Sequence, residues 1–264
     1  MERAIYFSDY DKLKEEDLRN YSRIYFGNEF CDELTPELDT IKEVVSMIGD
    51  KEKLFTLMTC YVSEDKIRNY YKIIELLAKL KPGSEVVIND WGILNICLQN
   101  NLSPVLGRLL VRQKRDPRIS HFIRHLPELP KIRMEQTGLN KYFTDFIKRH
   151  KIKRMELDNL LQGIDMAELQ YSDFSYSVYL PYGYITTSRI CLLRCINTGR
   201  HIKRLNSLPC SYACRNGLFK LRNKHIKETL FIKGNTLFFK NYSESFLEDE
   251  SRIDRIVYEP EIPD

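Results

Sequence analysis

The sequence lacks the segments that would export this chain or anchor it in a bilayer. None of its 264 residues belongs to an apolar run of about 18 residues, the length that a membrane-spanning helix needs. The first ten residues carry Glu2 and Asp9 and have no apolar core, so they do not resemble a signal peptide. We therefore expect a cytoplasmic protein with no membrane insertion. Repeats and low-complexity linkers are also lacking, which favours one large domain or two small ones.

The chain has little excess charge and an odd number of cysteines. A net charge of +4 permits nucleic-acid binding but does not require it. Seven cysteines without an export signal argue against a disulfide framework. The cysteines are therefore expected to be buried apolar residues, ligands or nucleophiles, and their positions must distinguish these roles.

Apolar and β-branched runs alternate with helical patterns through the first 157 residues. Strands are predicted at 22–26, 53–62, 85–89, 104–110 and 154–157, and helices at 40–48, 65–80, 92–99 and 142–150. This alternation is typical of parallel βαβ units. It predicts an α/β fold, a TIM-barrel-like (β/α) barrel that is either complete or incomplete.

The pattern changes after Leu180. Leu218–Leu221 and Thr229–Lys240 are predicted to be antiparallel strands, with Lys233-Gly234-Asn235 as a hairpin turn. We expect a barrel-like domain with a Cys-rich loop over residues 1–217. Residues 218–264 are expected to form a small C-terminal β extension and a polar tail of the same domain.

Barrel proteins carry their functional residues at the carboxyl ends of the strands. The polar residues predicted there are pocket candidates, with a helix cap or a hydrogen bond within the barrel as the alternative for each: Asn89, Asp90, Glu156 and Asp158. Trp91 is expected in the core. The basic run 108–118 is expected to be a solvated loop, with an anion site as the alternative.

Four cysteines occur close together in the sequence, as two pairs with three intervening residues each: Cys191, Cys195, Cys210 and Cys214. Their flanks carry six basic residues, which favour thiolates: Arg189, Arg194, Arg200, Lys203, Arg204 and Arg215. The spacing alone favours zinc and iron–sulfur binding equally.

Cys60 and Cys97 lie in apolar patterns and are expected in the core. The pair His121 and His125 is expected to lie on the surface or to have a structural role.

Several segments, in the same order, resemble the collagenase-like peptidase family (unassigned-peptidase family thirty-two), particularly its members in anaerobic ubiquinone biosynthesis. The likeness covers roughly residues 20 to 225 and rests on Ile24–Cys31, Val86–Gly92, Arg154–Asp158, Ser188–Cys191 and Cys210–Cys214. In such members one early and three late cysteines hold a [4Fe–4S] cluster. The resemblance therefore implies the ligands Cys31, Cys191, Cys210 and Cys214, with Cys195 as an alternate ligand.

The resemblance also implies a function. Related members take part in oxygen-independent hydroxylation of a small molecule or of RNA, together with a second family subunit as a heterodimeric partner. We expect this chain to be such a subunit. The alternatives are a non-catalytic redox or RNA-binding accessory protein, or a true peptidase. Peptidase activity is doubted, because the sequence has neither a Gly-x-Ser-x-Gly nor a His-Glu-x-x-His motif.

Overall fold

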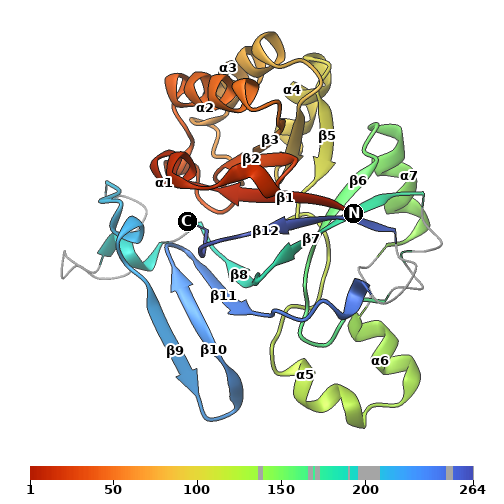
Figure 1. Cartoon of the computed structure of the whole chain (residues 1–264). Coiled ribbons are helices and arrows are strands. Elements are labelled where there is room, and N and C mark those ends of the chain that lie inside the picture. Colours follow the sequence, from red (N-terminus) through yellow and green to blue (C-terminus); the bar gives the residue numbers. More distant parts are fainter. Residues whose placement is uncertain are drawn as a thin grey trace.

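A computed structural model of the chain describes residues 1–135, 139–165, 169, 173–189, 191–195, 209–247 and 252–263. Its main element is a closed barrel of eight parallel strands in the order β1-β12-β7-β6-β5-β4-β3-β2 (Figure 1). The strands are β1 (Glu2–Phe7), β2 (Arg23–Gly27), β3 (Leu54–Met58), β4 (Glu85–Ile88), β5 (Ser103–Leu106), β6 (Arg154–Asp158), β7 (Ser175–Leu180) and β12 (Ile253–Tyr258). The predicted TIM-barrel fold is confirmed, and the barrel is complete.

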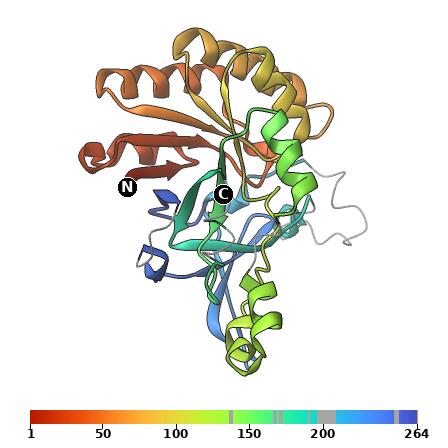
Figure 2. The same ribbon diagram turned by 90° about the vertical axis from the view of Figure 1, so that its right-hand side faces the viewer.

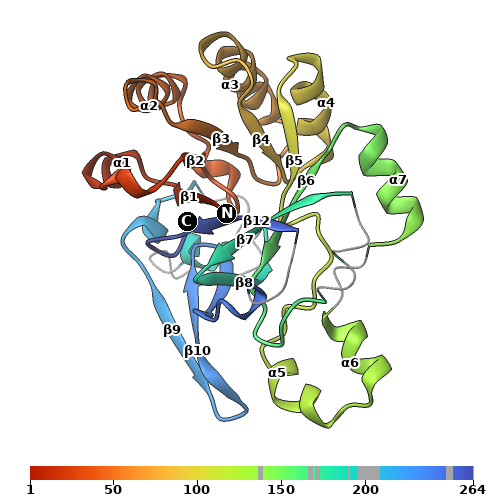
Figure 3. The ribbon, with the colours of Figure 1, turned by 45° about the vertical axis from the view of Figure 1, so that its right-hand side comes forward.

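Seven helices among the described residues follow the strands, and α5 and α6 project away from the barrel (Figure 1). The helices are α1 (Tyr10–Glu15), α2 (Leu38–Asp50), α3 (Ile67–Leu80), α4 (Trp91–Gln99), α5 (Ile119–Phe122), α6 (Glu128–Glu135) and α7 (Lys141–Arg149). In α3, the buried side chains Tyr70, Ile73, Ile74 and Leu77 recur at helical spacing and form the face that packs on the barrel. Helices α2, α3 and α4 lie side by side over one half of the barrel (Figures 2 and 3). In the part of the chain that the structure describes, no helix is long and apolar enough to cross a membrane.

A second, antiparallel sheet has the strand order β8-β11-β10-β9. Its strands are β8 (Tyr182–Thr187), β9 (Phe219–Asn223), β10 (Ile226–Lys233) and β11 (Thr236–Lys240). The predicted hairpin turn is confirmed: Lys233 pairs with Thr236, and Gly234 has a φ of 59°, a conformation that glycine adopts without strain. Tyr182, Tyr184 and Phe238 of this sheet pack against Phe30 and Leu109, so the sheet lies over the carboxyl end of the barrel.

Buried ion pairs close both ends of the barrel. At the carboxyl end, Arg108 contacts Glu29 at 2.6 Å, Glu259 at 2.8 Å and Asp158 at 3.1 Å, and all four side chains are essentially inaccessible to solvent. At the amino end, Arg255 contacts Glu2 at 2.6 Å and Glu85 at 2.7 Å. A small apolar cluster that includes Tyr25, Met58 and Val87 belongs to the core of the molecule.

The structure corrects four expectations. Residues 253–258, expected within a polar tail, form β12, which pairs with both β1 and β7. β1 itself was not predicted. Arg108 was expected in a solvated loop but is fully buried, because three carboxylates surround it. Trp91, expected in the core, is 40% exposed and packs edge-on against Phe146. Cys60 and Cys97 are buried as predicted.

Candidate metal centre

Cys31 is held at the carboxyl end of β2 by a turn that the local sequence specifies. Gly27 has a φ of 131°, and a Cβ atom there would lie 2.3 Å from the carbonyl oxygen of Met58, so only glycine fits. The side-chain oxygen of Asn28 then accepts hydrogen bonds from the backbone N–H groups of Phe30, at 3.1 Å, and Cys31, at 2.8 Å. These contacts fix the course of the loop that presents the Cys31 thiol.

The late cysteines lie on short turns next to the second sheet. Cys191 directly precedes a 3₁₀ turn, Leu192–Cys195, and Cys214 lies within another, Ala213–Arg215. Between Cys210 and Cys214, Tyr212 adopts a left-handed conformation with a φ of 53°. Its backbone N–H donates to the sulfur of Cys210 at 3.4 Å. The chain thus bends back, and the two thiols of this pair face the same space.

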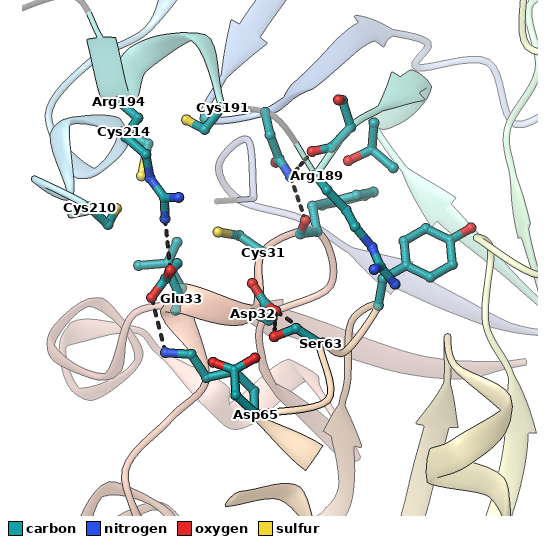
Figure 4. A pocket seen from close by; sticks show the side chains of 18 residues that line it. Cys31, Asp32, Glu33, Ser63, Asp65, Arg189, Cys191, Arg194, Cys210 and Cys214 are labelled. Atoms are coloured by element: carbon teal, nitrogen blue, oxygen red, sulfur yellow. Dashed lines mark hydrogen bonds and ion pairs between the residues drawn. The ribbon is translucent and has the colours of Figure 1, made fainter. Parts of the chain in front are cut away.

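Cys31, Cys191, Cys210 and Cys214 line one cavity of about 440 Å³ (Figure 4). The cavity lies at the rim of the barrel, between the loop after β2 and the second sheet. None of the described cysteines forms a disulfide. The expectation that Cys31 lies beside the late cysteines is therefore confirmed. The Cys195 side chain, like the flanking residues Arg200, Lys203 and Arg204, lies outside what the structure describes.

Ionic contacts connect the cysteine loops to the barrel. Glu33 pairs with Arg194 at 2.7 Å and with Lys66 at 3.0 Å, so it joins the 3₁₀ turn after Cys191 to α3. These hydrogen bonds hold the pKa of Glu33 below its usual value, the bond from Lys66 contributing most. Asp32 accepts a hydrogen bond from the Ser63 hydroxyl at 2.6 Å. Sequence reasoning missed Glu33, Asp32 and Ser63, because polar loop residues carry no pattern that identifies their partners.

Cys31 is not arranged as a nucleophile. Its pKa is raised to about 12, mainly by burial, with a backbone hydrogen bond that lowers it and smaller raising effects of Asp32, Cys214 and Cys210. A reactive catalytic cysteine has a lowered pKa and a neighbouring base. The described residues that line the cavity include no histidine. The described lining thus shows no Cys–His pair.

The polar pocket candidates lie elsewhere and have partners within the protein. Asn89 bonds the backbone of Thr59 and Leu109, and Asp90 caps α4 by accepting from Gly92. Glu156 accepts a hydrogen bond from Tyr179, and Asp158 pairs with two arginines, as described above for Arg108. None of these four residues lines the cysteine cavity. His121 lies 3.4 Å from Glu228, and His125 is exposed.

Among the described residues, no group of three or more His, Cys, Asp or Glu side chains could hold a metal ion as it stands. The four thiols are instead distributed around part of the cavity wall (Figure 4). Arg194 lies among them, and its Nε atom is buried without a hydrogen-bond partner among the residues that the structure describes. An acceptor in the cavity would satisfy this donor, and sulfur in a thiolate-bound cluster is one such acceptor.

Neither a family model nor a curated protein matches this sequence. Among solved structures, a putative copper homeostasis protein CutC from Streptococcus agalactiae is 14% identical, with a TM-score of 0.43 over 68% of this chain and 87% of that one. A GH18 chitinase from Cycas revoluta is 6% identical, with a TM-score of 0.40 over 98% and 94% of the two chains. A group IV chitinase from Ostrinia furnacalis is 10% identical, with a TM-score of 0.33 over 97% and 91%. Similarities at this level say nothing about function.

Proposed function

We propose that this chain is an iron–sulfur protein in which Cys31, Cys191, Cys210 and Cys214 bind a [4Fe–4S] cluster. The observation that carries the proposal is the shared cavity: four cysteines from separate segments of the chain line its wall. Four thiolates are the usual ligand set of such a cluster, one for each iron. The resemblance to the collagenase-like peptidase family selects the same four cysteines.

The resemblance, and not the shape or charge of the cavity, favours a cluster over a single zinc ion. The lining carries three basic residues, Lys66, Arg189 and Arg194, and three acidic ones, Asp32, Glu33 and Asp65, so its formal charges balance. Arg194 and Lys66 both pair with Glu33.

We further propose that the protein is a subunit of an oxygen-independent hydroxylation system and works with a second member of the same family. This part rests on the resemblance. The polar part of the cavity supports it, because Ser63, Asp32 and Tyr61 line the same space as the cysteines and provide hydrogen-bonding groups for a small substrate. A bound cluster would supply one-electron chemistry or an iron site for a substrate oxygen.

Anaerobic purification with iron and acid-labile sulfide analysis tests the cluster. We expect four irons and four sulfides per chain and a brown visible absorbance. Cys31→Ser, Cys191→Ser, Cys210→Ser and Cys214→Ser should each lose most of this absorbance. Cys97→Ala, which changes a buried cysteine of α4 that is not part of the cavity, is the matched control and should retain it. Stoichiometric zinc without sulfide would contradict the proposal.

Cys195→Ala separates the alternate ligand from the proposed set. If Cys195→Ala loses the cluster while Cys31→Ser retains it, Cys195 is a ligand in place of Cys31, and the proposal that the protein binds a cluster is unchanged.

Co-purification of the tagged chain with a second family member from anaerobic cells tests the hydroxylase part of the proposal. The Cys214→Ser variant is the control for association that depends on the cluster. A chain that always purifies alone and fully loaded with cluster would contradict the partner proposal.

A further inference from the structure

Arg194 is an arginine of the cavity that the proposed ligand set lines. It follows Cys191 by one turn and lies in the 3₁₀ turn Leu192–Cys195. Its guanidinium donates to Glu33 at 2.7 Å, and its side chain lines the same cavity as Cys210. Only 12% of the side chain is exposed, so little water competes for this contact.

The contacts of Arg194 keep its charge in place. A guanidinium keeps its proton at any pH at which the protein is folded, and the carboxylate of Glu33 pairs with it at 2.7 Å. Glu33 is fixed in turn by Lys66 at 3.0 Å. Arg194 is therefore a permanent cation whose direction is set by a partner that is itself anchored to α3.

One donor of this buried cation has no protein partner. The Nε–H group of Arg194 is inaccessible to solvent and makes no hydrogen bond to the residues that the structure describes. A buried donor without an acceptor is destabilising, so such groups are rare in native proteins. In a cavity lined by thiols, a sulfur atom of a bound cluster is an acceptor of suitable chemistry.

We propose that Arg194 donates hydrogen bonds to the sulfur atoms of the bound cluster and its Cys210 ligand and thereby raises the reduction potential of the cluster, with Glu33 positioning it. This inference rests on the proposed cluster. When the cluster takes up one electron, its negative charge increases by one, and the sulfur atoms become better acceptors. A fixed cation with N–H groups directed at sulfur stabilises the reduced form more than the oxidised form.

The second arginine of the cavity provides a matched control. Arg189 lines the same cavity and carries the same charge, but it is exposed and shows no contact with a cysteine among the described residues. Arg189→Gln therefore removes one positive charge from the cavity without removing a hydrogen bond to sulfur. A difference between Arg194→Gln and Arg189→Gln isolates the contribution of the hydrogen bonds from that of net charge.

The test is a redox titration of anaerobically loaded protein with dithionite as the electron donor, followed by visible absorbance and electron paramagnetic resonance. For Arg194→Gln we expect the ratio of reduced to oxidised cluster at a fixed potential to fall at least tenfold, which corresponds to about 59 mV for a one-electron couple. Arg194→Lys, which keeps the charge but loses the Nε–H group, should fall between wild type and Arg194→Gln. Glu33→Asp, which keeps the carboxylate charge but shortens its reach to Arg194, should shift the potential in the same direction.

The outcomes separate this inference from the proposed function. If the wild-type protein holds no cluster after anaerobic loading, both the proposed function and the proposed role of Arg194 are wrong. If wild type and Arg194→Gln hold equal iron and sulfide but titrate at the same potential, only the role of Arg194 is wrong. Equal shifts in Arg194→Gln and Arg189→Gln would also overturn it, because charge alone would then explain the effect. If Arg194→Gln does not fold, Arg194→Lys and Glu33→Asp decide the question.

Discussion

Asn235 donates its side-chain amide to the backbone carbonyl of Phe30 at 2.7 Å, across 205 residues of sequence. The same amide group donates to the carbonyl of Ser188 at 2.6 Å. The turn between β10 and β11 is thereby joined to the loop that precedes Cys31 and to the end of β8, close to Cys191. One side chain thus connects the early and late parts of the candidate metal centre.

Asn235→Ala should weaken both the fold and the site. The substitution leaves two carbonyl groups without their donor, so we expect a loss of about 1–3 kcal/mol in the free energy of unfolding, measured by urea denaturation. Asn223→Ala is the matched control, because its side chain caps only the exposed turn of the β9–β10 hairpin and its loss should cost less than about 0.5 kcal/mol. Iron content after anaerobic loading should fall in Asn235→Ala alone. Equal stabilities of the two variants would refute the structural role of Asn235.

Gly27→Ala should distort the loop that carries Cys31. The added Cβ atom meets the carbonyl oxygen of Met58 at 2.3 Å, and a φ of 131° is strained for alanine. We expect a loss of about 2–4 kcal/mol in the free energy of unfolding. At Gly49, within α2, an added Cβ meets nothing within 4 Å, so Gly49→Ala should be neutral or stabilising by up to about 1 kcal/mol. Denaturant unfolding of both variants checks this, and a Gly27→Ala protein as stable as wild type would contradict the described backbone.

Arg108→Met should be strongly destabilising. It removes the cation that compensates Glu29, Asp158 and Glu259, all of them buried, while keeping a similar side-chain length. Removing one partner of a buried ion pair costs about 3–5 kcal/mol. The exposed Arg222 of β9 gives the control, because Arg222→Met should change stability by less than about 0.5 kcal/mol. A loss of under 1 kcal/mol for Arg108→Met would show that the barrel end is not closed by this network.

The stability of the protein should fall between about pH 4.5 and pH 7 because of Glu156. Burial raises the pKa of this carboxyl group to about 7, against a lowering hydrogen bond from Tyr179. In this range the unfolded chain releases the proton while the folded protein retains it, so rising pH favours unfolding, by an amount on the order of 3 kcal/mol.

Glu156→Gln removes this titration and keeps an acceptor for the Tyr179 hydroxyl. Urea unfolding at a series of pH values should therefore give a shallower decline with rising pH for Glu156→Gln than for wild type. The exposed Glu64 is the control, and Glu64→Gln should follow the wild-type curve. Identical pH profiles for wild type and Glu156→Gln would show that Glu156 ionises normally in the folded protein.

The sequence by itself determined the elements whose patterns are local. The alternation of apolar strands with amphipathic helices such as α3 predicted the parallel barrel, and Lys233-Gly234-Asn235 predicted the β10–β11 turn. Cys60 and Cys97 were identified as core residues from their apolar neighbours. Each of these features depends on residues that are only a few positions apart in the sequence. Backbone preferences and hydrophobic periodicity can be recognised over such short segments.

Only the tertiary structure decided which distant residues meet. Residues 253–258 stand within a polar and acidic tail, although four of the six are apolar or aromatic, and pairing with β1 and β7 shows that they form the strand β12. The basic run around Arg108 predicts a solvated loop. The burial of Arg108 could not be predicted, because its three carboxylate partners come from the ends of three other strands. The contacts of Arg194 with Glu33 and of Asn235 with Phe30 likewise join segments 161 and 205 residues apart. Closure of the barrel brings these segments together, and no local pattern encodes that closure.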